Sequence, residues 1–187
     1  MQHRTNVDKL LAESFKKLAC KTPIDKITIK EITDKAGVIR PTFYNHFQDK
    51  YELLEWIIRT EILDPVIPLL QEGRLREGLI RIFTNLQEDK DFYTKVVRLE
   101  GQNSCESITR NFIKEILFSF INEKAGNKIA AQKGLTVDLI AEYFAQSITF
   151  VIIKWLKLDM SFSPEQMADI FKYMTTHSME EIIAEMQ

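Results

Sequence analysis

Apolar residues recur at every third or fourth position through most of this sequence, a spacing that places them on one face of an α-helix. The pattern is clear from residue 5 to Pro23, and it returns in segments 75–88, 92–100 and 105–124. With only 6 glycines and 5 prolines, the chain has few of the residues that interrupt helices. No segment alternates apolar and polar residues as a half-buried strand would. We therefore expect an all-α protein.

Residues 28–47 predict two short helices joined by a tight turn. Thr28 and Glu31 form a capping-box pattern, in which each side chain satisfies a backbone N–H of the other residue at the start of a helix. Gly37 is expected to end that helix, because glycine readily adopts the left-handed conformation found there. The segment RPTFYNHF follows as a short aromatic helix. This order is typical of a helix-turn-helix, whose second helix enters the major groove of DNA.

The second helix has two different faces. At about 100° per residue, Phe43 and Phe47 fall on one face and can anchor the helix to the domain core. Arg40, at its N-terminal end, can hold a guanine with two hydrogen bonds. Tyr44 at the edge and Lys50 at the start of the next helix are expected to reach phosphate. The opposite face carries small or hydrogen-bonding groups: Pro41, Thr42, Asn45 and His46. A merely solvated helix also has a polar face, so the spacing alone leaves DNA binding open.

Charge is distributed unevenly along the chain, whose net charge is −2. Residues 1–50 carry 10 Lys and Arg against 6 Asp and Glu, a net of +4, and residues 51–187 carry a net of −6. A basic segment on an acidic remainder indicates a polyanion at one end, although an ordinary solvated surface can give the same count. We expect a helix-turn-helix DNA-binding domain in residues 1–50 and a second, helical domain in residues 51–187.

The stretch ITIKEITDKAGVIRPTFYNHFQDKYELL resembles the signature of TetR-family transcription regulators, with AG before a TFYNHF-type helix and then a DKxELL helix start. The resemblance covers about residues 8–56, and it implies about nine helices and a homodimer on a palindromic operator in double-stranded DNA. More distantly, the chain resembles the regulators related to dihydroxyacetone kinase. Ile39 departs from the pattern, because the family often has a capping Ser or Thr there. The implied DNA contacts are Thr28, Arg40, Pro41, Thr42, Tyr44, Asn45, His46 and Lys50.

A longer helix is expected to connect the two domains. It begins at Asp49 and continues to about Leu63, after which Pro65 and Pro68 break or bend it. A displacement of its C-terminal end would change the orientation of the second helix of the helix-turn-helix, the recognition helix. Further along, residues 125–134 contain two glycines and two lysines and are expected to form a loop.

Segments 136–158 and 164–186 carry more apolar surface than one small bundle can hide. In TetR-like proteins the last two helices usually build the dimer, which fits these segments. The family also implies an effector, so the resemblance makes residues 51–187 a helical effector-sensing and dimerisation domain. We expect a repressor controlled by a small molecule. The alternative is a regulator of the same kind controlled by a partner protein. Aromatic residues that could line an effector pocket, or belong to the core, are Trp56, Phe92, Tyr93, Phe112, Phe118 and Phe120.

The sequence carries no motif of an enzyme or of a metal site. Its three histidines lie far apart without zinc spacing, and its glycines match neither a dinucleotide nor a phosphate loop. Cys20 and Cys105 are too few for a disulfide framework. The first residues lack an apolar signal core. The longest uncharged run, 143–153, has 11 residues, against the roughly 20 that span a bilayer. We expect a cytoplasmic protein that is not an enzyme, without a cofactor, a metal or a membrane.

Overall fold

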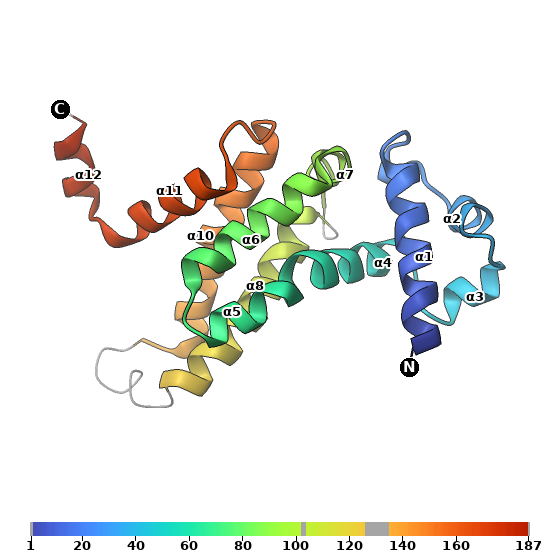
Figure 1. The fold of residues 1–187 in the computed structure, drawn as a ribbon, viewed down its shortest axis with the longest axis horizontal. Coiled ribbons are helices and arrows are strands. Elements are labelled where there is room, and N and C mark those ends of the chain that lie inside the picture. Colours follow the sequence, from blue (N-terminus) through green and yellow to red (C-terminus); the bar gives the residue numbers. More distant parts are fainter. Residues whose placement is uncertain (1, 102–103, 126–134, 187) are drawn as a thin grey trace.

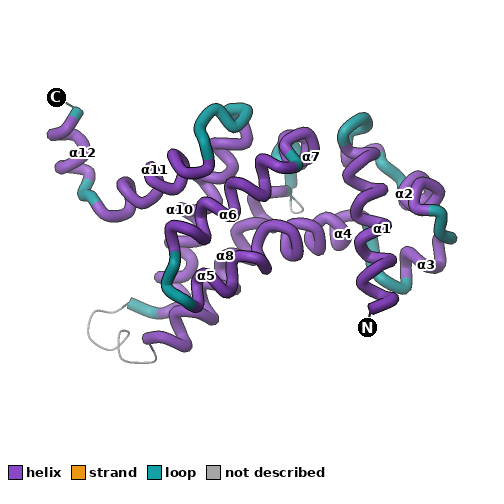
Figure 2. The backbone as a smooth tube through the Cα atoms, in the orientation of Figure 1, coloured by secondary structure: helices purple, strands orange, loops and turns teal. Residues whose placement is uncertain are grey.

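A computed structural model describes residues 2–101, 104–125 and 135–186, and the regular secondary structure within these ranges is helical throughout (Figures 1 and 2). The all-α prediction is confirmed. The N-terminal helices gather at one end of the molecule, and Figure 1 shows them joined to the body by one long helical connection. They are α1 (Gln2–Ala19), a 3-10 turn (Ile24–Lys26), α2 (Ile29–Ala36) and α3 (Arg40–Tyr44).

A small apolar core holds these helices together. Leu11 and Phe15 of α1, Ile32 of α2 and Phe43 of α3 are fully buried. Each of these residues lies on the apolar face that the helical spacing predicts. Complete burial of four such side chains contributes about 1.5–3 kcal/mol each relative to exposure, which is enough to fix the order of the short helices.

The connection to the body is a chain of helical segments of different pitch. It runs from α4 (Lys50–Ile57) through a π-helical segment (Ile58–Leu63) and a 3-10 turn (Asp64–Val66) into α5 (Ile67–Gln71). Pro65 and Pro68 lack the N–H that an α-helix needs, so the regular pattern cannot continue through them. The predicted bend at the two prolines is confirmed, and the π-helical segment before them is an addition that the sequence did not indicate.

The body packs its helices in pairs. It contains α6 (Leu75–Glu88), α7 (Lys90–Val96), α8 (Cys105–Ala125), α10 (Val137–Lys157), α11 (Pro164–Thr176) and α12 (Met179–Glu185). α8 and α10 run antiparallel along each other, and α11 packs on α6 (Figure 1). The loop expected at 125–134 lies outside the described residues except for residue 125, which ends α8.

The C-terminal helix predicted over 164–186 is divided in two. His177 has extended backbone, with φ −112° and ψ 144°, and ends α11. Ser178 then starts α12 with a capping box, in which its side chain accepts a hydrogen bond from the Glu181 N–H. The continuous helix was a wrong prediction, because the Ser178–Glu181 pair is a start signal that the apolar spacing concealed. Figure 1 shows α12 turned away from the body at the far end of the chain.

α10 is long and apolar enough to pass as a membrane span by length and composition, although its uncharged run is short. In the structure, 44% of the residues in its most apolar window are buried inside the protein. Its inner face packs on α8, and Trp155 is 1% exposed with its ring 5.0 Å from that of Phe83. A buried core helix can also meet these criteria of length and composition. The contacts of α10 are those of a core helix.

Candidate nucleic-acid interface and effector cavity

Local hydrogen bonds set the geometry of the helix-turn-helix. The Thr28 N–H donates to the Glu31 carboxylate at 2.8 Å, and the Glu31 N–H donates to the Thr28 hydroxyl at 3.2 Å. This predicted capping box begins α2. Gly37 ends α2 with φ 70°, a left-handed conformation that strains any residue with a Cβ atom. The chain is thereby turned toward α3 within three residues.

Two phenylalanines anchor α3 as expected. Phe43 is 0% and Phe47 4% exposed, and their ring centroids lie 5.9 Å apart. Phe47 also meets the indole of Trp56 in α4, at a centroid distance of 6.1 Å. Pro41 lies in the first turn of α3, where its fixed φ suits a helix start. Ile39 occupies the N-cap position and makes no capping hydrogen bond, as its side chain requires.

The other face of α3 is open to solvent. Arg40, Pro41, Tyr44 and Asn45 are exposed, and Thr42 is half-buried. The Arg40 guanidinium donates to the Tyr44 hydroxyl at 3.2 Å and lies 5.9 Å from the centre of its ring. This contact presents the guanidinium fork in a defined position beside the helix, which suits a bidentate hydrogen bond to a base. Figure 1 shows α3 at the end of the molecule opposite α12, clear of the body.

His46 and Lys50 have internal partners. His46 Nδ1 lies 2.6 Å from the Asp8 carboxylate, and both side chains are nearly buried, which ties the end of α3 to α1. Lys50 Nζ donates to the backbone carbonyls of Asp25 at 2.7 Å and Ile27 at 2.8 Å. Burial lowers the pKa of the Lys50 ammonium. Both side chains therefore hold the domain together.

The body contains a cavity of about 310 Å³ with an almost wholly apolar lining. Such a volume lies within the range of small-molecule sites. Its walls come from the end of the π-helical segment, α5, α6, α8, α10 and α11, and they include Leu63, Ile82, Ile113, Phe120, Ile148 and Phe171. Thr175 supplies a hydroxyl, and no charged side chain is among the described lining residues. A ligand here would meet an apolar surface.

A metal centre has no counterpart in the described part of the chain, where no three His, Cys, Asp or Glu side chains gather closely enough to hold an ion. Cys105 is 3% exposed, and burial raises the pKa of its thiol to about 11. A thiol in that state is a weak nucleophile, because the reactive form is the thiolate.

Comparison with known families identifies both halves of the molecule. The description "Bacterial regulatory proteins, tetR family" matches residues 16–57. A second description, "Transcriptional regulator C-terminal region", matches residues 73–177, more than half of the chain. This chain belongs to the TetR family. The fold and family are those of transcription regulators, as the resemblance in the sequence implied.

The TetR-family relatives with names include an activator. The dhaKLM operon transcriptional activator DhaS of Lactococcus lactis subsp. lactis (strain IL1403) is 30% identical over 88 residues, which are 47% of each chain. An uncharacterized regulator of Mycobacterium tuberculosis is 24% identical over 103 residues, 55% of this chain and 48% of the relative. The aligned segments therefore span about half the length of these curated relatives.

Solved structures of the TetR type share the fold over most of both chains. A structure titled dihydroxyacetone kinase operon activator DhaS has a TM-score of 0.64 at 21% identity, covering 90% of this chain and 93% of its own. NalD of Pseudomonas aeruginosa, titled the secondary repressor of the MexAB-OprM multidrug efflux pump, has a TM-score of 0.60 at 17% identity, covering 89% and 93%. Identity this low shows the fold alone.

The sequence-predicted contacts of this TetR-family chain fall into two groups. Five of them lie in or directly after α3 with side chains open or half-open to solvent: Arg40, Pro41, Thr42, Tyr44 and Asn45. The other three lie outside this segment and form hydrogen bonds within the domain: Thr28, which is exposed, and His46 and Lys50, which are half-buried. Of the six aromatic residues proposed for a pocket, Phe120 is the one that lines the apolar cavity. Phe92 and Tyr93 are buried core residues.

Two features of this TetR-family chain had not been predicted. Ile39 is 68% exposed at the entry of α3, where an apolar side chain stands in a polar surface. The sequence shows that Ile39 replaces a capping residue, but the exposure of the Ile39 side chain depends on the conformation of the turn. Lys16 is the second feature, because its partners lie 45 and 73 residues away in the chain. No local spacing rule could connect it with them.

Proposed function

We propose that this chain is a TetR-type transcription regulator that reads a two-fold operator with α3. The observation that carries the proposal is the division of α3 into an aromatic face locked in the core and an open face with Arg40 at its entry. Arg40 is assigned to a guanine, and Thr42 and Asn45 to neighbouring base edges. Tyr44 and the α2 N-terminus capped by Thr28 face the phosphate backbone.

Ile39 adds an apolar contact to this proposed interface. An exposed isoleucine at the start of a recognition helix can meet the methyl group of a thymine in the major groove. His46 and Lys50 act by holding α3 in place, since their polar atoms already have partners inside the domain.

The proposed regulator acts as a homodimer through α10 and the C-terminal helices. Leu139, Tyr143 and Phe150 of α10 are 53%, 63% and 57% exposed, and at 100° per residue they fall within about 40° of one another. Ile170 and Met174 of α11 are also exposed and apolar. A second copy that covers this stripe would bring two recognition helices to one operator, where half-sites lie about 34 Å apart.

The apolar cavity supports control by a small molecule. Its lining offers no charged partner, and burying an unpaired charge is costly, so the proposed effector is uncharged and largely apolar. An effector that binds the DNA-competent and incompetent arrangements unequally shifts the balance between them. We expect repression that the effector relieves, although the named relatives include both an activator and a repressor.

Control by a partner protein is the second candidate. It is favoured by α12, whose apolar residues Met179, Ile183 and Met186 are 77%, 50% and 82% exposed. An exposed apolar face of this kind is typical of a protein-interaction surface.

The test begins with DNA. Sequencing the fragments that co-purify with the full chain should yield a palindromic site, and binding to that site should exceed binding to random DNA. A protein that binds all DNA equally would contradict the proposed function. Octan-1-ol and octanoate then serve as matched probes of the cavity. The alcohol should change operator affinity more than the acid. If neither does, while cell extract stripped of small molecules does, control belongs to a partner protein.

A further inference from the structure

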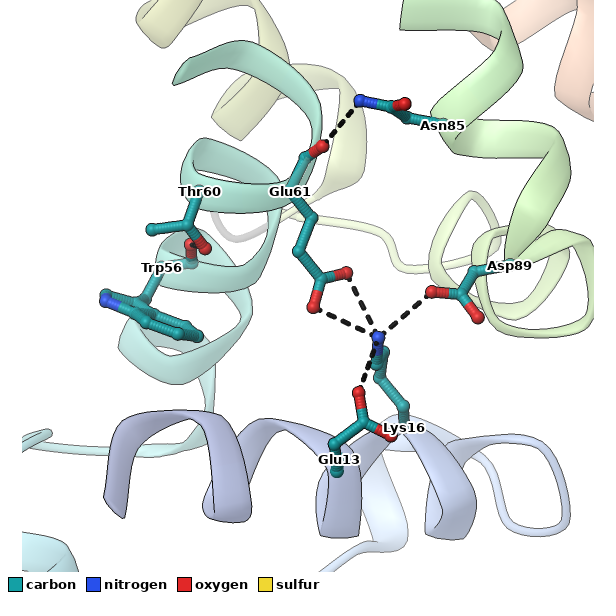
Figure 3. Close-up of polar contacts among 7 residues, drawn as sticks. All are labelled: Glu13, Lys16, Trp56, Thr60, Glu61, Asn85 and Asp89. Atoms are coloured by element: carbon teal, nitrogen blue, oxygen red, sulfur yellow. Dashed lines mark hydrogen bonds and ion pairs between the residues drawn. The ribbon is translucent and has the colours of Figure 1, made fainter. Parts of the chain in front are cut away.

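Lys16 of α1 lies at the junction between the DNA-binding helices and the body (Figure 3). Its ammonium donates to the Glu61 carboxylate at 3.0 and 3.1 Å and to the Asp89 carboxylate at 2.9 Å. Glu13, one turn earlier in α1, lies 3.0 Å away. The Lys16 side chain is 11% exposed. These four residues, the Lys16 cluster, join α1 to two separate segments of the body.

The charges of the Lys16 cluster depend on one another. Burial alone would lower the pKa of the Lys16 ammonium, but its hydrogen bonds to Asp89, Glu61 and Glu13 raise it above the ordinary value. Burial raises the pKa of the Glu61 carboxyl, and the Lys16 ammonium counteracts this effect. Without Lys16, three carboxylates would face one another across the junction. The ammonium is therefore what allows α1 and the body to approach here.

Glu61 is held at both its side chain and its backbone. In an α-helix its carbonyl would accept from the N–H of residue 65, but that residue is Pro65 and has none. Asn85 of α6 replaces the missing donor, with Nδ2 at 2.7 Å from the Glu61 carbonyl oxygen (Figure 3). Asn85 is 7% exposed, so this bond fixes the π-helical segment to the interior of the body.

We propose that Glu61 and Lys16 are positioning residues that set the angle of the DNA-binding helices on the body. Asn85 holds the Glu61 backbone on α6, and the Glu61 carboxylate holds α1 through Lys16. The contact between Phe15 and Phe92, at a centroid distance of 6.2 Å, forms the apolar half of the same junction. Charge-assisted hydrogen bonds from Lys16 to Glu61 and Asp89 add directional contacts to this apolar packing between α1 and the body.

The same elements reach the effector cavity, so this inference rests on the proposed function. Leu63 lines the cavity two residues after Glu61, and Ile82 lines it about one turn before Asn85 on α6. A molecule that fills the cavity thus touches both helices that hold Glu61. π-Helical segments often mark functional sites, and a change of one residue in register rotates a helix by about 100°. Such a change would move the Glu61 carboxylate away from Lys16 and break the hydrogen bonds between them.

The test uses the full chain with a nitroxide on Cys20, an exposed native cysteine at the end of α1. In the homodimer, the distance between the two labels reports the spacing of the DNA-binding domains. Lys16→Met is compared with Lys17→Met, because Lys17 is the exposed neighbour on the same helix. Asp89→Asn is a milder variant that removes one carboxylate charge without removing Lys16. Circular dichroism confirms the fold of each variant.

We expect Lys16→Met to broaden the distance distribution, with a smaller broadening in Asp89→Asn and none in Lys17→Met. Affinity for the two-site operator should fall at least about tenfold, while affinity for a single half-site changes less than about twofold, because only bivalent binding needs the correct spacing. If Lys16→Met leaves both the distance distribution and the operator affinity unchanged, this inference is overturned and the proposed function is not affected. Equal losses on operator and half-site would also overturn it, since they indicate general damage. A wild-type protein without a two-site advantage would overturn the proposed function and this inference together.

Discussion

Substitution of Lys50 distinguishes clearly between a structural role and a DNA-contacting role for this residue. Its ammonium donates to the carbonyls of Asp25 and Ile27, which clamps the 3-10 turn before α2 to the first residue of α4. Lys50→Met retains the apolar stem and removes both bonds. A hydrogen bond to a charged group is worth about 1.5–3 kcal/mol, and the bond to Asp25 counts less because it is exposed. We therefore expect a loss of about 2–3 kcal/mol.

A loss of this size lowers the melting temperature of a chain this long by roughly 5–10 °C. The measurement is thermal unfolding followed by circular dichroism, with Lys30→Met as the matched control. Lys30 is 75% exposed and has one weak ion pair, to Asp34 at 3.6 Å, so its removal should cost little. The salt dependence of DNA binding completes the assay. If Lys50→Met melts like the wild type and the slope of log affinity against log salt falls by about one, Lys50 binds phosphate and this reasoning is refuted.

Further outcomes follow from the exposed and buried residues. Cys20 is exposed and Cys105 is buried, so a thiol reagent at about pH 8 should modify one cysteine per native chain and two in urea; two in the native state would contradict the packing around α8. Burial raises the pKa of the Cys105 thiol from 9.0 to about 11. The stability gained by burying the neutral thiol is therefore fully present below the unfolded-state pKa of 9.0 and is lost as the pH rises through the folded-state pKa of about 11. Urea midpoints should therefore drop less between about pH 8 and 10 in Cys105→Ala than in the wild type. Arg40→Ala should cost about 1–3 kcal/mol on the cognate operator and relax preference at one base pair, whereas equal loss on random DNA would reduce Arg40 to a phosphate contact. Phe150→Glu should yield monomers by light scattering, with Phe118→Glu on α8 as the exposed control; a dimeric Phe150→Glu would move the interface elsewhere.

The features that could be predicted from the sequence are those whose causes lie within a few residues. The Thr28–Glu31 box and the stop at Gly37 each involve one turn of helix, and both are present. The division of α3 into two faces likewise follows from the position of Phe43 and Phe47. Short-range hydrogen bonding and helical periodicity are enough to place these elements.

The features that could not be predicted depend on which apolar or charged residues meet across the fold. Along α10, Ile152 is 2% exposed and Phe150 is 57% exposed, yet both are large apolar residues in the same run. Hydrophobicity alone does not say which of them faces α8 and which faces outward. Lys50 and His46 were assigned to DNA by their place in the motif, and their partners inside the domain were invisible in a linear pattern.

α4 and the π-helical segment after it connect the N-terminal helices to the body. Leu53 and Leu54 of α4 are fully buried, and α4 packs on α1, so the helix is part of the DNA-binding core. Less than three turns later the same continuous connection supplies Leu63 to the wall of the cavity. The buried side chains of α4 and of the π-helical segment belong to one hydrophobic core, so a displacement of either segment is resisted by the packing of the other, since packed interiors deform little. Glu61 lies between these two ends, and its carboxylate is one of the contacts, beside Asp89 and the Phe15–Phe92 pair, that join α1 to the body.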